Sequence, residues 1–301
     1  MKRPHLVPVL MTVGSALLWS SSFSVAKVGL RYIDPYSFVL LRFVVASLVL
    51  LVLVLITGHG RLLGAYLRDR YTLLLGITLA ASFGLQFRGQ TETTAAKAAI
   101  IINASVVLVA PLGLLFLKEK VGPRAIAAMC VGLVGVYLVT KARAGTPEEG
   151  GTLAGNLLVA GSSLSYALYV VFSKMAVTRR DIREIPFVTG VFLWALPVFL
   201  VPSLPRLVSG LEVETNAWLA TAYLAVFCSV APFILYTAAI KHISALTSAI
   251  VLLAELVFGV IIAFLFLSES LAVSAWVGCA LICAGIFIAG TRSEPQARPN
   301  P

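Results

Sequence analysis

The chain has 301 residues, of which 59% are hydrophobic and 12% are charged, and its mean hydropathy is +0.98. A soluble domain of this size has too little interior to bury so much apolar surface, so the composition excludes a soluble protein. It predicts an all-α polytopic membrane protein in contact with the lipid bilayer. The net charge of +10 would suggest nucleic acid as a partner of a soluble chain. Here the basic residues lie in short connections between apolar runs, which argues against that partner.

The apolar runs predict ten transmembrane helices, because a helix that crosses a bilayer needs about 20 mostly apolar residues. Arg88 cuts the third run short, and four prolines crowd the seventh. The expected spans are 6–30, 35–57, 71–87, 94–117, 123–140, 153–176, 185–204, 217–240, 245–267 and 273–291.

The two halves of the chain share a sequence pattern. A shift of 150 residues places Glu119 on Glu269 and matches further identical residues between 99–135 and 249–285, while a shift of 147 places Lys27 on Lys174. Since five helices are an odd number, the second copy must enter the membrane from the other side, which predicts two inverted five-helix repeats. The expected domains are a first repeat at 1–140, a connecting loop at 141–152, a second repeat at 153–291 and a disordered cytoplasmic tail at 292–301.

The distribution of basic residues predicts the orientation of the chain. With both termini in the cytoplasm, 15 of the 23 lysines and arginines fall in cytoplasmic segments and seven fall outside, with Arg42 left inside the second span. Cytoplasmic connections of membrane proteins carry the excess of positive charge, so both termini are expected in the cytoplasm. The apolar run at the N-terminus is interpreted as a retained helix because an internal stretch, 153–174, repeats its pattern.

A set of residues at matching positions of the two halves resembles the EamA domain. In the first half these are Trp19, Phe23, Lys27, Pro35, Arg42 and a Leu-Lys-Glu that ends at Glu119. In the second half they are Tyr166, Lys174, Pro186, Glu255 and a Leu-Ser-Glu that ends at Glu269. The resemblance implies the ten-helix drug/metabolite transporter superfamily and, within it, looks most like bacterial exporters of aromatic amino acids and related metabolites. The location it implies is a bacterial-type inner (plasma) membrane.

A central binding site is expected where polar and aromatic side chains interrupt the hydrocarbon at helical spacing. The alternative is a purely structural role, in which the serine hydroxyls form hydrogen bonds with the backbone of their own helix and the aromatic rings and amides only pack the helices together. The candidates for substrate binding are Trp19, Ser22, Phe23, Gln86, Asn103, Tyr166, Tyr169, Tyr236 and Glu255.

Glu255 is the single charge in the apolar stretch 249–267. A carboxylate at that depth costs roughly 3 kcal/mol or more unless it faces a partner or a wet cavity, so it is expected to point inward. Three roles remain open: it carries a proton that couples transport, it binds a substrate ammonium group, or it braces its helix by pairing with a basic residue.

Basic groups near span ends are candidates for gating or for steering the substrate, although long basic side chains also reach water from such positions for no functional reason. The gate or steering candidates are Lys27, Lys174 and His242 near span ends, together with Arg42 within the second span.

No metal or other cofactor is expected. The four cysteines lie in apolar runs without metal-ligand or redox spacing, and no glycine-rich phosphate loop is present in the sequence. Glycines of the fifth and tenth expected helices allow close helix approach, either within the chain or in a homodimer. These positions are Gly132, Gly135, Gly278 and Gly285.

The sequence therefore predicts a secondary transporter, with a small molecule as its partner, that exports amino acids by alternating access. A sugar-phosphate or nucleotide-sugar exchanger is the alternative within transport, weakened because a phosphate needs several basic groups at mid-depth and only Arg42 is available. A membrane scaffold or receptor that does not transport would leave the inverted repeats unexplained. An enzyme is not expected, because the sequence has no paired intramembrane aspartates and no HExxH or Ser-His arrangement.

Overall fold

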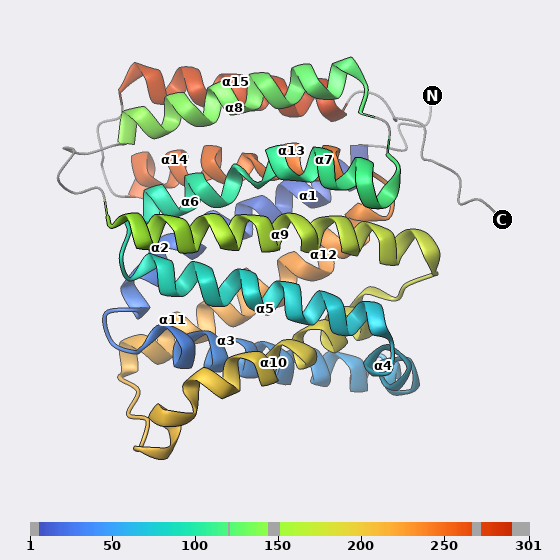
Figure 1. The fold of residues 1–301 in the computed structure, drawn as a ribbon, viewed down its shortest axis with the longest axis vertical. Helices are drawn as coiled ribbons and strands as arrows, with labels where there is room; N and C mark the ends of the chain where they lie inside the picture. The colour runs from blue at the N-terminus through green and yellow to red at the C-terminus, as the bar shows by residue number, and fades with distance from the viewer. Residues whose placement is uncertain (1–5, 120, 144–150, 267–271, 291–301) are drawn as a thin grey trace.

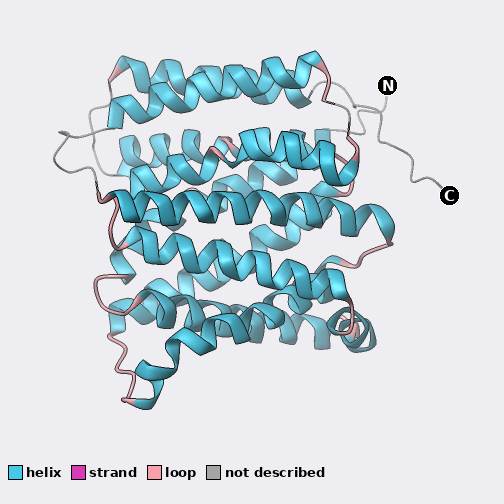
Figure 2. Cartoon of the chain, viewed as in Figure 1, coloured by secondary structure: helices cyan, strands magenta, loops and turns pink. Residues whose placement is uncertain are grey.

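The computed structural model describes residues 6–119, 121–143, 151–266 and 272–290. Within these ranges the chain forms helices joined by short connections, and no strand is present (Figure 2). Glu269, the tail at 292–301 and most of the connection at 141–152 lie outside the described residues, so the expectations for them stay predictions.

Each half of the chain forms a series of helices, several of which follow one another after a break of one or two residues. The first half contains α1 (Leu6–Trp19), α2 (Ser22–Gly29), α3 (Pro35–Ile56), α4 (Gly60–Leu67), α5 (Arg70–Gln90), α6 (Ala95–Asn103), α7 (Ser105–Leu117) and α8 (Pro123–Arg143). The second contains α9 (Leu153–Arg179), α10 (Glu184–Val208), α11 (Thr215–Ala225), a π-helical turn (Val226–Val230), α12 (Ala231–Ile240), α13 (Ala245–Leu252), α14 (Ala254–Phe266) and α15 (Val273–Gly290).

Eight helical stretches of the described residues are long and apolar enough to cross a membrane, which supports a polytopic α-helical membrane protein. The count of ten crossings stays a prediction, because α5 is not among the eight and the apolar part of α8 is shorter. The expected end of the third span at Phe87 is wrong, since α5 continues to Gln90 with the Arg88 side chain 40% exposed. The prolines of the seventh span do not break it, and α10 runs on through all of them.

Two contacts fix the direction of α1 against α12. The Ser15 hydroxyl donates to the Pro232 carbonyl at 3.1 Å, and the Trp19 indole N–H donates to the Cys228 carbonyl at 2.9 Å. Trp19 follows Ser15 along α1, whereas its partner Cys228 precedes Pro232, so α1 and the segment that continues into α12 are antiparallel.

The direction of α9 follows from two further contacts with α12. The Tyr169 ring packs against the Phe233 ring at 5.9 Å between centroids, and the Lys174 ammonium donates to the Ile240 carbonyl at 3.0 Å. The numbering rises along both helices, so α9 and α12 are parallel. Therefore α1 and α9, the first helices of the two halves, run in opposite directions.

The helices lie side by side across the molecule (Figure 1). The main pairings are α8 with α15, α5 with α9, α3 with α10, and α1 with α12. A Cβ atom added at Gly290, at the end of α15, would lie 3.5 Å from the Val9 side chain near the start of α1. We call this the termini side of the molecule, and α9 and α12 both end on it.

An aromatic part of the hydrophobic core lies between α3, α5 and α10. The Phe43 ring of α3 stacks on Phe192 at 4.7 Å and contacts Phe83 and Phe199 at 5.2 and 4.9 Å between centroids. All four rings are buried, so this aromatic cluster joins the two halves of the chain.

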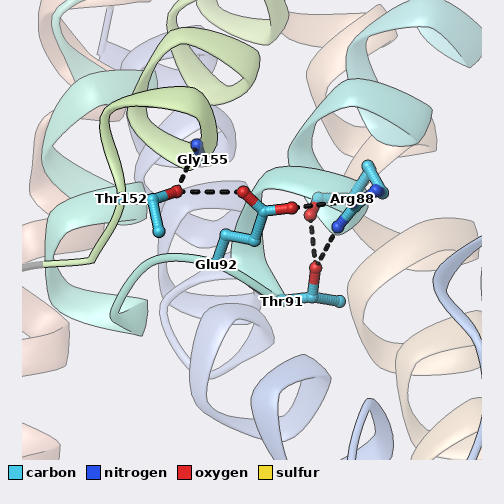
Figure 3. Close-up of polar contacts among 5 residues, drawn as sticks. All are labelled: Arg88, Thr91, Glu92, Thr152 and Gly155. Atoms are coloured by element: carbon cyan, nitrogen blue, oxygen red, sulfur yellow. Dashed lines mark hydrogen bonds and ion pairs between the residues drawn. The ribbon is translucent and has the colours of Figure 1, made fainter.

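A polar network joins the two halves on the side away from the termini (Figure 3). The Glu92 carboxylate pairs with Arg88 at 2.6 Å and accepts a hydrogen bond from the Thr152 hydroxyl at 2.9 Å. The same hydroxyl accepts from the Gly155 N–H at 2.9 Å and so caps the start of α9. The Thr152 N–H donates to the Glu92 carbonyl at 2.8 Å, which anchors the second half to the end of α5.

The expected close-packing glycines bring α8 and α15 together at one edge of the bundle (Figure 1). A Cβ atom at Gly135 would lie 2.6 Å from the Gly278 carbonyl oxygen, and one at Gly285 would lie 2.8 Å from the Ala128 carbonyl oxygen. These glycines are therefore used within the chain. The homodimer stays a prediction, and these glycines no longer supply an argument for it.

Replacing Gly135 with alanine is expected to destabilise the protein by about 1 to 3 kcal/mol, because the new methyl group meets backbone atoms that cannot move aside. The measurement is the thermal unfolding midpoint of the purified protein in detergent. Gly64→Ala on α4 is the control, since nothing lies within 4 Å of a Cβ there. A midpoint for Gly135→Ala that equals or exceeds that of the control would contradict the packing described above.

Candidate functional site

A cavity lies between the two halves of the chain. About 50 Å³ of it is open to the centres of water molecules, and since one water needs roughly 10 to 15 Å³ on this measure, the space holds several waters. The residues that line it come from ten helices, namely α1, α2, α3, α5, α6, α7, α9, α12, α13 and α14. They are Trp19, Ser22, Phe23, Arg42, Ser82, Phe83, Gln86, Ile102, Asn103, Ser105, Tyr166, Phe233, Ala249, Leu252 and Glu255.

Several helices are interrupted where they reach this cavity. The break between α1 and α2 falls at Ser20 and Ser21, the break between α6 and α7 at Ala104, and the break between α13 and α14 at Leu253. Residues on both sides of each break line the cavity. Discontinuous helices of this kind commonly form the binding sites of transporters, because their free backbone groups and helix ends can face a ligand.

Seven of the nine substrate-binding candidates line the cavity. They are Trp19, Ser22, Phe23, Gln86, Asn103, Tyr166 and Glu255. The structure therefore brings most of the candidate side chains to one cavity. Their role in binding a substrate stays a prediction.

Tyr169 and Tyr236 are brought to the same region but do not line the cavity. Each lies one helical turn beyond a lining residue towards the termini side, and both are almost fully buried. The Tyr236 hydroxyl hydrogen-bonds the Ser248 hydroxyl at 3.1 Å, and the Tyr169 ring packs on Tyr166 at 6.1 Å. These two tyrosines therefore lie buried beyond the lining residues, towards the termini side.

Arg42 belongs to the cavity wall, although the sequence suggested a gate or steering role. Its side chain is 1% exposed, and its Nε donates to the Ser229 hydroxyl at 2.9 Å while Nη2 donates to the Cys228 carbonyl at 2.8 Å. The guanidinium also lies 4.7 Å from the centre of the Phe83 ring and 5.7 Å from that of Phe87. All these partners are neutral, so they orient the cation without cancelling its charge.

The acceptor for Arg42 exists because of a proline. Pro232 has no N–H and cannot donate to the carbonyl of Cys228 four residues earlier. That carbonyl, at the π-helical turn, accepts from Arg42 and from the Trp19 indole instead. Buried π-turns are frequent at functional sites because they redirect backbone groups in this way. A proline in an apolar run, here Pro232, is the sequence signal that could have located this free carbonyl.

Glu255 lies in the first turn of α14 and is partly exposed to the cavity. The N-terminal end of a helix carries a partial positive charge, which favours a carboxylate there. Among the residues that the structure describes, none forms a hydrogen bond or an ion pair with this carboxylate. The expected bracing pair with a basic residue is thus not found in the described part of the chain.

Aromatic rings make up much of the wall. The Trp19 ring meets Phe233 edge-on at 5.1 Å and Tyr166 at 6.5 Å between centroids. Phe83 lies 6.3 Å from Phe233 on the other side. Such a wall suits an apolar or aromatic group of a ligand.

Seven lining residues were not among the candidates from sequence. Ser82, whose hydroxyl lies 3.2 Å from that of Ser162, and Ser105 look like any helix serine in the sequence. The others are apolar and cannot be told from core residues by spacing. The full set is Ser82, Phe83, Ile102, Ser105, Phe233, Ala249 and Leu252.

Lys27 and Lys174 do not line the cavity and instead bind backbone carbonyls at helix ends. Lys27 donates to the carbonyls of Gln90 and Thr93 at 2.5 and 2.7 Å, at the end of α5. Lys174 donates to that of Ile240 at the end of α12. Lys27 thus joins α2 to the C-terminal end of α5, and Lys174 joins α9 to the C-terminal end of α12. The dipole of a helix favours a cation at its C-terminal end.

The two lysine contacts lie on opposite sides of the molecule, since α2 ends away from the termini side and α9 ends on it. The fourth gate candidate, His242, is exposed in the connection between α12 and α13, away from the cavity. Gate roles for these three residues stay predictions.

Lys174→Met is expected to lower the free energy of unfolding by about 1 to 3 kcal/mol, because it leaves the buried carbonyl of Ile240 without its donor. Lys27→Met is the matched control, with a smaller loss, because Lys27 is partly exposed and water can replace it. Thermal unfolding in detergent measures both. Equal losses, or a larger loss for Lys27→Met, would contradict this account.

The comparisons with known proteins are consistent over nearly the whole chain. The family model described as EamA-like transporter family matches residues 6–141 and again residues 153–291. A protein named an uncharacterized transporter from Archaeoglobus fulgidus is 29% identical over 95% of this chain and 96% of its own length. A protein of Salmonella typhimurium named a probable amino-acid metabolite efflux pump is 24% identical over 90% of this chain and 91% of its own.

A solved crystal structure has the same fold, with a TM-score of 0.75 over 94% of this chain and 96% of that chain, at 19% identity. At that identity the likeness concerns the fold alone. The two family matches together cover both halves and meet at the polar connection between them. The chain belongs to the EamA-like transporter family.

Proposed function

We propose that this transporter exports amino acids, chiefly those with aromatic or apolar side chains, and related small metabolites across a bacterial-type inner membrane by alternating access. The observation that carries the proposal is the cavity between the halves. It combines aromatic rings, neutral hydrogen-bonding groups, one cation and one carboxylate. A ligand with an apolar side chain and balanced charges matches that lining. The name of the Salmonella relative supports the same substrate class.

Several features support ten membrane crossings arranged as two inverted repeats, 1–140 and 153–291. The first helices of the halves are antiparallel, as the contacts of α12 with α1 and α9 require. Exchanging the halves also turns the α5–α9 pairing into the α12–α1 pairing and leaves α3–α10 and α8–α15 unchanged. Two copies related by an axis in the membrane plane have this property.

Alternating access needs a cavity that opens to each side in turn. Here Tyr169 and Tyr236 are buried on the termini side of the lining, the side that the charge distribution predicts to be cytoplasmic. The space open to the centres of water molecules is about 50 Å³, room for a few waters. We expect the broken helices around it to move apart when an aromatic amino acid enters.

A phosphate-bearing substrate is the alternative. A phosphate dianion is usually held by several arginines or lysines. Arg42 is the basic residue in the cavity lining, while Lys27 and Lys174 are engaged with backbone carbonyls. The lining therefore favours a substrate whose negative charge is a single carboxylate.

Purified protein in liposomes loaded with radiolabelled phenylalanine is expected to release it several-fold faster than protein-free liposomes. The aromatic wall and the balanced charges of the cavity are the physical reason. A panel with other amino acids, nucleosides and glucose 6-phosphate measures the specificity. Release of glucose 6-phosphate without release of any amino acid would refute the proposal in favour of its alternative.

The orientation is tested by labelling single cysteines, introduced into a cysteine-free chain, with a membrane-impermeant maleimide. Cysteine in place of Glu148, in the connection between the halves, should react in intact cells because it lies outside. Cysteine in place of Ser293, after the last helix, should react only after the cells are permeabilised. If both positions react from the same side of the membrane, an odd number of crossings in the second half is ruled out.

A further inference from the structure

We propose that Arg42 and Glu255 are the two charge-recognition groups of the transport site, with Arg42 binding the carboxylate and Glu255 the ammonium group of one zwitterionic amino acid. This inference rests on the proposed function and adds the residues that select the substrate's charged ends. The two side chains come from different halves, on α3 and α14, and line the same cavity. No ion pair joins them in the structure, which describes both.

Arg42 is prepared to bind an anion. Of its five N–H donors, the hydrogen bonds to Ser229 and Cys228 use one on Nε and one on Nη2. These two bonds and the faces of Phe83 and Phe87 hold the guanidinium in one orientation. No described acidic side chain pairs with it, so its charge is open to a ligand. A fixed guanidinium with free N–H groups matches the planar carboxylate, which can accept two parallel hydrogen bonds.

Glu255 is prepared to bind a cation. Its position in the first turn of α14 favours the negative charge. Its carboxylate faces the cavity and has no hydrogen-bonding or ion-pair partner among the described residues. An ammonium group of the substrate would supply both the opposite charge and three N–H donors.

The two groups together select a zwitterion. A ligand with only one charge would leave the other protein group uncompensated inside the membrane, which is strongly unfavourable. A ligand with both charges compensates both groups, and its net charge remains zero. The rings of Trp19, Tyr166 and Phe233 then provide an apolar surface for its side chain.

The test measures binding in detergent by thermal shift with three ligands of similar size: phenylalanine, phenylalanine methyl ester, which lacks the carboxylate, and N-acetylphenylalanine, which lacks the ammonium group. The wild-type protein is expected to bind phenylalanine about 10- to 100-fold more tightly than either analogue, because each analogue loses one charge-assisted interaction.

Each variant should lose one of these two preferences. Arg42→Gln is expected to bind phenylalanine and its methyl ester equally while still rejecting N-acetylphenylalanine. Glu255→Gln is expected to bind phenylalanine and N-acetylphenylalanine equally while still rejecting the ester. Gly64→Ala, a change on α4 outside the cavity lining with nothing within 4 Å of the new methyl group, is the control and should keep both preferences. If Arg42→Gln does not fold, Arg42→Lys retains the charge without the paired donors and should reject the ester several-fold less strongly than the wild type.

The outcomes separate the two proposals. If the wild type binds amino acids but both variants keep both preferences, this inference is wrong and the proposed function stands. The same holds if the losses are exchanged between the two variants, or if Glu255→Gln changes neither preference, as a purely proton-carrying role would give. If no amino acid binds to or is transported by the wild type, the proposed function fails and the inference fails with it.

Discussion

The carbonyl oxygen of Cys228 is the acceptor on which the site depends. Pro232 cannot donate to it, and within a membrane a buried carbonyl needs a donor from the protein. Trp19 and Arg42 supply that donor from two helices of the first half. Because this carbonyl lacks a backbone donor from Pro232, the side chains of Trp19 and Arg42 both donate to it and lie next to each other. The free Cys228 carbonyl is therefore the reason both for this contact between the two halves and for the orientation of the Arg42 guanidinium.

The packing of the bundle divides it into a close-packed edge and an interrupted centre. At the edge, α8 and α15 meet through glycines whose backbones would clash with any added Cβ. At the centre, α1, α6 and α13 end against the cavity and new helices begin. Close backbone packing resists rearrangement, whereas a helix break absorbs changes of direction at a few residues. This arrangement concentrates the expected motion of transport around the cavity.

Eight of the ten expected spans coincide with helices that are long and apolar enough to cross a membrane, because runs of about 20 apolar residues are visible in the sequence. The prediction misplaced the end of α5, since Arg88 can lie exposed beside Glu92 without ending the helix. The candidates from the sequence include seven of the fifteen lining residues. Helical spacing could not separate Tyr166, which lines the cavity, from Tyr169, which does not, because both lie on one helix face. The role of Arg42 was missed because its partners are 186 and 187 residues away along the chain. Only tertiary contacts reveal such an orientation.

The different environments of the two central charges explain how they remain apart. A guanidinium and a carboxylate in a low-dielectric interior attract each other strongly, and a direct pair would neutralise the site. Arg42 is held against the π-turn by a carbonyl, a hydroxyl and two ring faces. Glu255 is favoured by the start of α14. Arg42 is thus oriented by neutral groups and ring faces, while Glu255 lies at the start of a different helix. The separation keeps two opposite charges available to one neutral, doubly charged ligand.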